Sequence, residues 1–161
     1  MTAIRIIGVG SPFGQDQLGW QAAEALQASG LAQRYAEGRV SIQCSDRPGA
    51  SLLVQMRGAD CVLIIDALQS GATPGTIRCL GEQELATTPG FFSSHDFGVV
   101  AALALGRVLG ELLARVRILG IEMDPAAADT APLPTMLLRQ LEEIIATEIN
   151  NYGDNDNADF K

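Results

Sequence analysis

Short apolar runs alternate along the chain with segments in which apolar residues recur at helical spacing. The runs are rich in β-branched residues and have the length of strands. Strands are predicted over Ile4–Val9, Gly38–Cys44, Cys61–Ile65, Thr76–Leu80 and Arg115–Ile121. Helices are predicted over Leu18–Ser29, Ala50–Arg57, a segment that begins at Ser93 or Ser94 and runs through Val108, and about Leu133–Ile149. Because strands and helices alternate, we predict an α/β fold, a three-layer α/β/α sandwich around a mainly parallel sheet.

The domain organisation follows from the length and the composition along the chain. The chain has 161 residues, the size of one domain, and neither an internal repeat nor a linker divides it. We therefore predict one domain over residues 1–150. Beyond Asn150 the sequence is polar, so residues 151–161 are expected to form a disordered tail.

Composition and charge narrow the class of partner. The net charge of -8 disfavours a protein that binds nucleic acid or an anionic membrane through a basic surface. Cys44, Cys61 and Cys79 are widely spaced in or beside apolar runs, which predicts reduced and mostly buried thiols. The N-terminus has no signal-peptide pattern, and no apolar run reaches the roughly 18 residues of a membrane span, so we expect a cytoplasmic protein.

Two carboxylates follow predicted strands. Asp16 comes after the glycine-rich turn that ends the first strand, and Asp66 comes directly after the third. If the strands take the doubly wound order 2-1-3, the segments after the first and third strands diverge and leave a crevice at the carboxyl edge of the sheet. This order would bring Asp16 and Asp66 together. Each aspartate could instead serve as a structural cap.

His95 is the only histidine of the chain and lies near the start of a predicted helix. The positive end of a helix disfavours the imidazolium form and so favours the neutral imidazole that metals bind. Together with Asp16 and Asp66, His95 would form a metal site with positions left for water or substrate. Taken alone, it could equally be an exposed residue of the first helical turn.

Other chemistries fit the sequence less well. Gly8-Val9-Gly10 suggests a dinucleotide loop, but the third glycine of the motif would fall at Phe13, and Pro12 lacks the N–H that such a loop uses. The sequence contains no GxSxG motif, and His95 has no evident pairing with a cysteine. Serine or cysteine hydrolysis is therefore disfavoured.

Several motifs occur in combination, namely Gly8-Val9-Gly10-Ser11-Pro12, Gly14-Gln15-Asp16-Gln17-Leu18-Gly19, the run Ala59–Ala67, Pro74-Gly75-Thr76-Ile77 and Ser94-His95-Asp96. In this combination the chain resembles the hydrogenase maturation endopeptidases, from about Ile4 to Ile149. The resemblance implies a twisted five-stranded sheet in which one strand, Thr76–Leu80, is antiparallel. The chain departs from the usual family pattern at Ser11, where asparagine is usual, and at Asp46-Arg47-Pro48-Gly49, where Asp-Gly-Gly-Thr is common.

The resemblance also implies a function. Members of this family remove a C-terminal extension from the large-subunit precursor of nickel-iron hydrogenases after nickel insertion. Their metal-binding residues map onto Asp16, Asp66 and His95, which would contact nickel carried by the precursor, with Asp16 and Asp66 as the catalytic residues. Either the metal polarises the carbonyl, or one aspartate activates a water as general base. Two alternatives stay open: a nickel-dependent chaperone or docking module that does not cut the precursor, and a nucleotide-binding α/β module.

Overall fold

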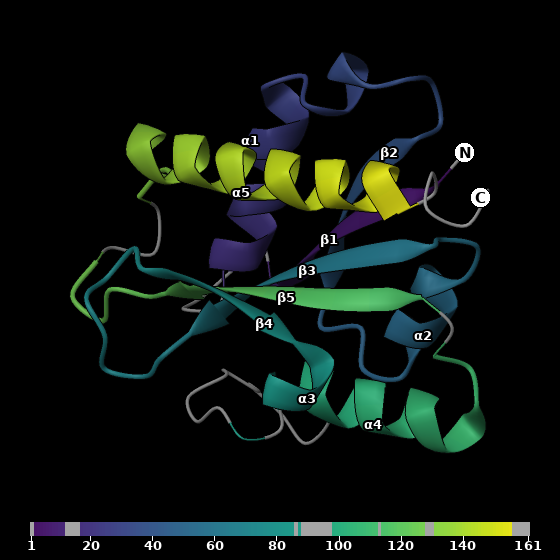
Figure 1. Cartoon of the computed structure of the whole chain (residues 1–161). Coiled ribbons are helices and arrows are strands. Elements are labelled where there is room, and N and C mark those ends of the chain that lie inside the picture. Colours follow the sequence, from purple (N-terminus) through teal and green to yellow (C-terminus); the bar gives the residue numbers. More distant parts are fainter. Residues whose placement is uncertain are drawn as a thin grey trace.

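The computed structural model of the chain is a layered α/β structure (Figure 1). It describes residues 2–11, 17–85, 87, 98–112, 114–127 and 131–155. Two of the three predicted site residues, Asp16 and His95, lie outside these ranges, and so do Ser93 and Ser94.

The strands of the described residues form one sheet in the order β2-β1-β3-β5-β4. The strands are β1 (Ile4–Gly10), β2 (Val40–Asp46), β3 (Cys61–Leu68), β4 (Ile77–Gly81) and β5 (Arg115–Glu122). All neighbouring pairs are parallel except β4 and β5, which are antiparallel. The predicted five-stranded mixed sheet and the 2-1-3 order are confirmed.

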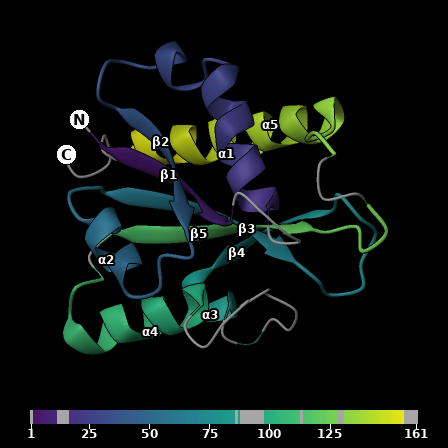
Figure 2. The same ribbon diagram turned by 180° about the vertical axis from the view of Figure 1, so that it is seen from behind.

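Helices cover both faces of the sheet (Figures 1 and 2). They are α1 (Leu18–Ala28), α2 (Ser51–Met56), α3 (Glu82–Leu85), α4 (Val99–Leu109) and α5 (Thr135–Asn155), with a 3-10 turn over Ala32–Arg34. One core lies between the sheet and α1 with α5, and includes Leu26 and Leu141. The other lies between the sheet and α2, α3 and α4, and includes Leu53 and Leu103. The two cores confirm the three-layer sandwich.

The central strand β3 is buried along its whole length, as expected for a parallel strand covered on both faces. Its side chains alternate between the two cores, so Leu63 and Ile65 face α1 and α5, whereas Val62 and Ile64 face α2 and α4. The strand was predicted to end at Ile65, but it continues to Leu68. It continues because β5 runs beside it up to the pair Leu68 and Glu122.

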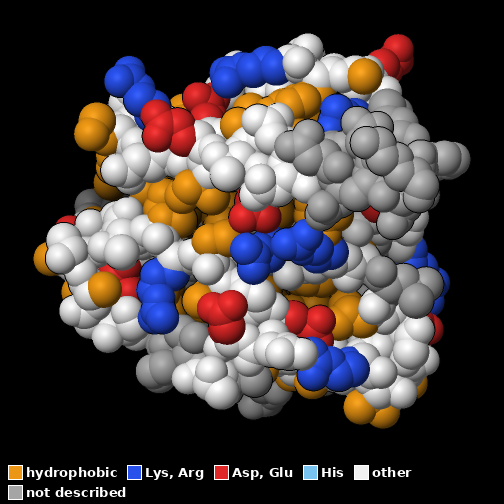
Figure 3. Space-filling view, in the orientation of Figure 1, with side chains coloured by type: hydrophobic (Ala, Val, Ile, Leu, Met, Phe, Trp, Pro, Cys, Tyr) orange, Lys and Arg blue, Asp and Glu red, His pale blue; other side chains and the backbone are white. Residues whose placement is uncertain are grey.

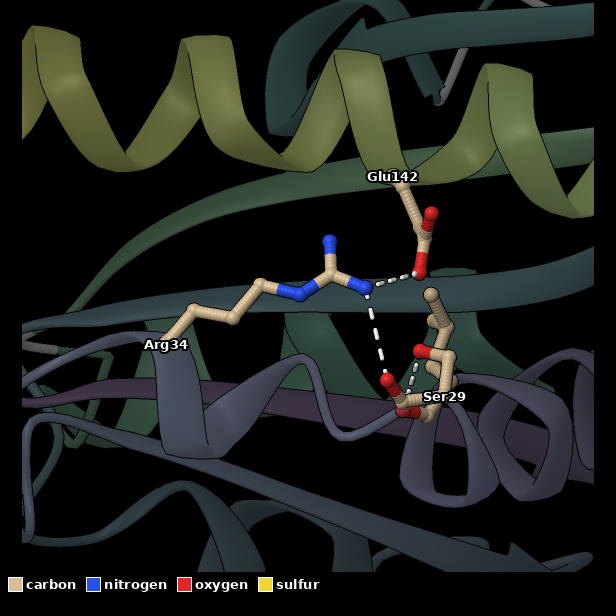
Figure 4. A network of polar contacts seen from close by, with 4 residues as sticks. Ser29, Arg34 and Glu142 are labelled. Atoms are coloured by element: carbon tan, nitrogen blue, oxygen red, sulfur yellow. Dashed lines mark hydrogen bonds and ion pairs between the residues drawn. The ribbon is translucent and has the colours of Figure 1, made fainter.

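The long helix α5 packs on the sheet through Leu137, Leu141, Ile145 and Ile149, which recur every four residues. An ion pair attaches the helix to the segment after α1. Arg34 Nη2 lies 3.0 Å from Glu142 Oε1 and also donates to the carbonyl oxygen of Ser29 (Figure 4). Arg34 thus connects α5 to the residue that follows α1.

Two predicted boundaries were wrong. The prediction of a disordered tail from residue 151 fails for residues 151–155, because α5 continues to Asn155. Tyr152 packs against the core, and the Arg115 guanidinium carbon lies 4.9 Å from the centre of its ring. These contacts stabilise the additional helical turn. The helix predicted from Ser93 or Ser94 begins at Val99 instead, because Gly98 has an extended backbone with ψ -172°. His95 therefore precedes α4 in the sequence.

Candidate functional site

The carboxyl edge of the sheet has a fork between β1 and β3. The two strands pair only as far as Gly8 and Ile65. Beyond that point β1 stays paired with β2 up to Gly10, and β3 stays paired with β5 up to Leu68. A fork of this kind is the switch point at which open α/β sheets bind ligands. Asp66 is the first residue of β3 beyond the fork.

The first turn of α1 enters this fork through glycines. A Cβ atom on Gly19 would lie 2.2 Å from the carbonyl oxygen of Val9 and 2.5 Å from that of Ile65. A Cβ atom on Gly8 would lie 2.2 Å from the carbonyl oxygen of Gly19. Backbone thus lies against backbone, which is possible because neither residue has a side chain. This packing accounts for Gly8 without a phosphate-binding loop.

Asp66 is a buried acid at the fork. It is 5% exposed, and its Oδ1 accepts a hydrogen bond of 2.8 Å from the backbone N–H of Ala67. Strand alternation places its side chain on the face of Val62 and Ile64, toward α2 and α4. A buried carboxylate is costly unless donors or cations compensate its charge, so a buried acid at the ligand-binding edge of the sheet is a candidate for chemistry or binding.

A second buried acid, Glu122, ends β5 and holds the loop that follows β3. It is 3% exposed, and its Oε1 accepts hydrogen bonds from the backbone N–H groups of Ser70 at 2.9 Å and Gly71 at 3.0 Å. Its Oε2 accepts a further bond of 2.7 Å from the Ser70 hydroxyl. These donors satisfy the carboxylate, so Glu122 positions the loop beside the candidate site.

The end of β2 completes the edge. Arg47, the residue after the strand, has a φ of 39°, the left-handed region that favours glycine. Its backbone N–H donates to the carbonyl oxygen of Gly10 at 2.8 Å, and its guanidinium forms an exposed ion pair of 2.9 Å with Asp46. Arg47 thereby holds the end of β2 against the end of β1.

The described residues contain part of the predicted site. Asp66 lies at the fork as predicted, while the placement of Asp16 and His95 is outside the described ranges. Gln17, the residue after Asp16, precedes α1 at the same edge. Among the described residues, no group of three or more His, Cys, Asp or Glu side chains is arranged to hold a metal ion.

The cysteines are unsuited to nucleophilic catalysis. All three are free thiols, of which Cys61 is buried and Cys44 and Cys79 are half-buried. Burial raises the pKa of Cys44 to about 11, with a smaller contribution from the charge of Glu24. Burial likewise raises the pKa of Cys61 to about 11. These thiols are therefore protonated at neutral pH, whereas a nucleophile needs the thiolate.

By its fold the chain is an open α/β protein with a buried acid at the carboxyl edge of its sheet, the edge at which proteins of this architecture bind ligands. The chain belongs to the hydrogenase maturation protease family, whose model, HycI, matches residues 31–150. The match includes Asp66 and His95 and begins after Asp16.

Curated relatives agree with this assignment. The hydrogenase expression/formation protein HupD of Thiocapsa roseopersicina is 27% identical over 122 residues, which cover 74% of this chain and 53% of HupD. The hydrogenase expression/formation protein HoxM of Azotobacter vinelandii is 28% identical over 127 residues, which cover 76% of this chain and 59% of HoxM. The chain thus spans little more than half the length of these relatives.

Solved structures show the same fold. The hydrogenase maturating endopeptidase HybD from E. coli superposes with a TM-score of 0.73 at 24% identity, over 94% of both chains. The [NiFe] hydrogenase maturation protease HycI from Thermococcus kodakarensis KOD1 superposes with a TM-score of 0.66 at 21% identity, over 92% of both chains.

Within the described residues, none of the helices combines the length and the apolar character that a bilayer crossing requires.

Two residues of the site have roles that the sequence analysis did not assign. Gly19 permits the close approach of α1, and Glu122 holds the loop after β3. The role of Gly19 could have been inferred from its place in the first turn of a predicted helix, since glycine is unfavourable there without a packing reason. The role of Glu122 could have been inferred from its place as an acid at the end of an apolar strand.

Proposed function

We propose that the chain is an endopeptidase that removes the C-terminal extension of a nickel-iron hydrogenase large-subunit precursor after nickel insertion. The observation that carries the proposal is Asp66, a buried carboxylate at the fork of a hydrogenase maturation protease fold. In this proposal Asp16, Asp66 and His95 contact nickel that the precursor already carries. The metal is then a feature of the substrate, and contact with it restricts cleavage to precursors in which nickel insertion is complete.

The chemistry assigned to these residues is aspartyl-type peptide hydrolysis. Asp66 is buried at the fork, and Asp16 is the second carboxylate of the proposed pair. One of them would take the proton of the attacking water and pass it to the leaving amine nitrogen, while nickel carried by the precursor would position the scissile carbonyl. The free thiols fit a reducing compartment, and we place the reaction in the cytoplasm with the newly made precursor.

The proposal is tested by mass spectrometry of nickel-loaded large-subunit precursors incubated with the protein. The expected result is a discrete C-terminal loss from one precursor that requires nickel and disappears in Asp66→Asn, Asp16→Asn and His95→Ala. Val108→Thr is the control, because Val108 is 83% exposed near the end of α4, which leads to the start of β5 and so to the edge of the sheet opposite Asp66. It should leave processing unchanged.

One outcome would contradict the protease, and another would contradict the role of Asp66. A nickel-dependent complex without cleavage would show the docking module instead. Unchanged processing in a folded Asp66→Asn protein would remove Asp66 from the mechanism.

A further inference from the structure

A groove begins at the carboxyl edge of the sheet and follows α5. It consists of two adjoining hollows, of about 260 Å³ and about 640 Å³, that share the lining residues Pro74, Gly75, Pro134 and Leu137. Figure 3 shows hydrophobic side chains gathered between α5 and the loop that precedes β4, at the left of the view. We call these two hollows the α5 groove.

The first hollow opens beside the candidate site. Gln17 and Leu18 at the start of α1 line it, together with Glu122 at the end of β5. Asp66 pairs with Gly120, so Glu122 lies two residues further along the neighbouring strand. A rise of about 3.3 Å per residue and a strand spacing of about 4.8 Å put the Cα atoms of Asp66 and Glu122 roughly 8 Å apart.

A bound chain would have to cross the edge of the sheet, because Asp66 faces α2 and α4 whereas the α5 groove lies on the side of α1 and α5. An extended peptide advances about 3.3–3.6 Å per residue, so about three residues lead from Asp66 into the first hollow. The second hollow then continues along α5 past Met136 and Gln140 to Glu143.

The lining indicates what the α5 groove accepts. Most of its surface is apolar, and Met136 is 67% exposed, which is unusual for so large an apolar side chain. The charged residues among those that line the two hollows are all acids, Glu122, Asp124 and Glu143. The lining therefore favours an extended segment with apolar side chains and a neutral or positive charge, and disfavours an acidic one.

We infer that the α5 groove binds the C-terminal extension of the precursor while the scissile bond lies at the fork beside Asp66. This inference rests on the proposed function. The folded, nickel-containing body of the precursor occupies the fork, so the extension is the part that can run away from it as a free chain. Binding along α5 orients the extension relative to the scissile bond and so determines which segment is released.

The test introduces negative charge into the α5 groove. Met136→Glu with Gln140→Glu changes the net charge by two units at exposed positions of α5 and keeps good helix formers there. Arg139→Glu is the control, since it makes the same change of net charge on the same helix, at an exposed residue that does not line the α5 groove. We expect the double variant to raise KM for the nickel-loaded precursor about tenfold with kcat changed less than about twofold, and the control to resemble the wild type.

A binding measurement separates this inference from the proposed function. In the Asp66→Asn background, the double variant should weaken binding of the full-length precursor but not of a precursor truncated at the cleavage site. Equal weakening of both would overturn the α5 groove as the site of the extension, as would an unchanged KM. If the wild type binds the precursor without cutting it, the proposed function fails, and the comparison of the two precursors still decides the inference.

Discussion

At the scale of single residues, the two buried acids of the carboxyl edge occupy different positions on the sheet. Glu122 receives three hydrogen bonds from Ser70 and Gly71, whereas Asp66 lies at the fork where the precursor is proposed to bind. We therefore assign different roles to two acids of similar burial, on the ground of their positions rather than of their residue type.

Replacing Glu122 should loosen the loop after β3. In Glu122→Ala the N–H groups of Ser70 and Gly71 lose their acceptor. Because both residues are exposed, water can replace the carboxylate, and the loss is roughly 0.5–1.5 kcal/mol of unfolding free energy for each hydrogen bond. Hydrogen exchange at these two amides should accelerate, and urea unfolding should shift to lower concentration. Glu122→Gln keeps an acceptor oxygen and should lose much less. Equal unfolding curves for all three proteins would refute the anchoring role.

At the scale of elements, the position of α1 depends on the contact between Gly8 and Gly19. The helix approaches so closely that a single methyl group would meet two carbonyl oxygens of different strands. The contact sets how far the first turn of α1 penetrates the fork.

Gly19→Ala should therefore destabilise the protein, although alanine is normally the better helix former. Overpacking against backbone costs about 1–3 kcal/mol, more than the gain of about 1 kcal/mol in helix propensity. Thermal or urea unfolding measures the difference. Gly81→Ala is the control, because a Cβ atom at Gly81 would have its nearest neighbour at 3.5 Å, an ordinary contact. A Gly19→Ala protein as stable as this control would show that α1 can move away without cost.

At the scale of the whole molecule, the buried thiols and Tyr152 connect stability to pH. Burial raises the pKa of Cys44 and of Cys61 from 9.0 to about 11, and burial, followed by the charge of Cys61, raises that of Tyr152 to about 12. In each case the folded state keeps a proton that the unfolded state has lost. The unfolded state is therefore favoured as the pH rises, from about 9 through about 11 for the two thiols and from about 10 through about 12 for Tyr152.

We expect the free energy of unfolding, measured with urea under reducing conditions, to fall between about pH 8 and pH 11. Cys44→Ala removes one of the responsible groups at a half-buried position and should make this decline shallower. Its stability near neutral pH provides the baseline for the comparison. A decline of the same steepness in the variant would show that the Cys44 thiol does not contribute.

Much of the architecture could be predicted from the sequence. The apolar runs identified the strands, the helical spacing in Leu137, Leu141 and Ile145 identified α5, and the alternation of elements indicated the layers. The ends of elements were less predictable. Whether β3 stops at Ile65 or at Leu68 depends on the length of β5 beside it, and residues 151–155 are helical where Tyr152 finds a packing partner. Neither neighbour is visible in the local sequence.

For the candidate site, the apolar run Cys61–Ile65 was enough to indicate a strand buried on both faces with Asp66 directly after the run, because burial on both faces leaves a signature in the strand's own residues. The resemblance carried by the motifs indicated the family, which the comparisons confirm. The tertiary structure alone decided that β1 and β3 part at Asp66, that Gly19 lies against Val9 and Ile65, and that Glu122 holds the loop of Ser70. These features are contacts between segments distant in sequence, and they depend on register and backbone approach, which no single segment encodes.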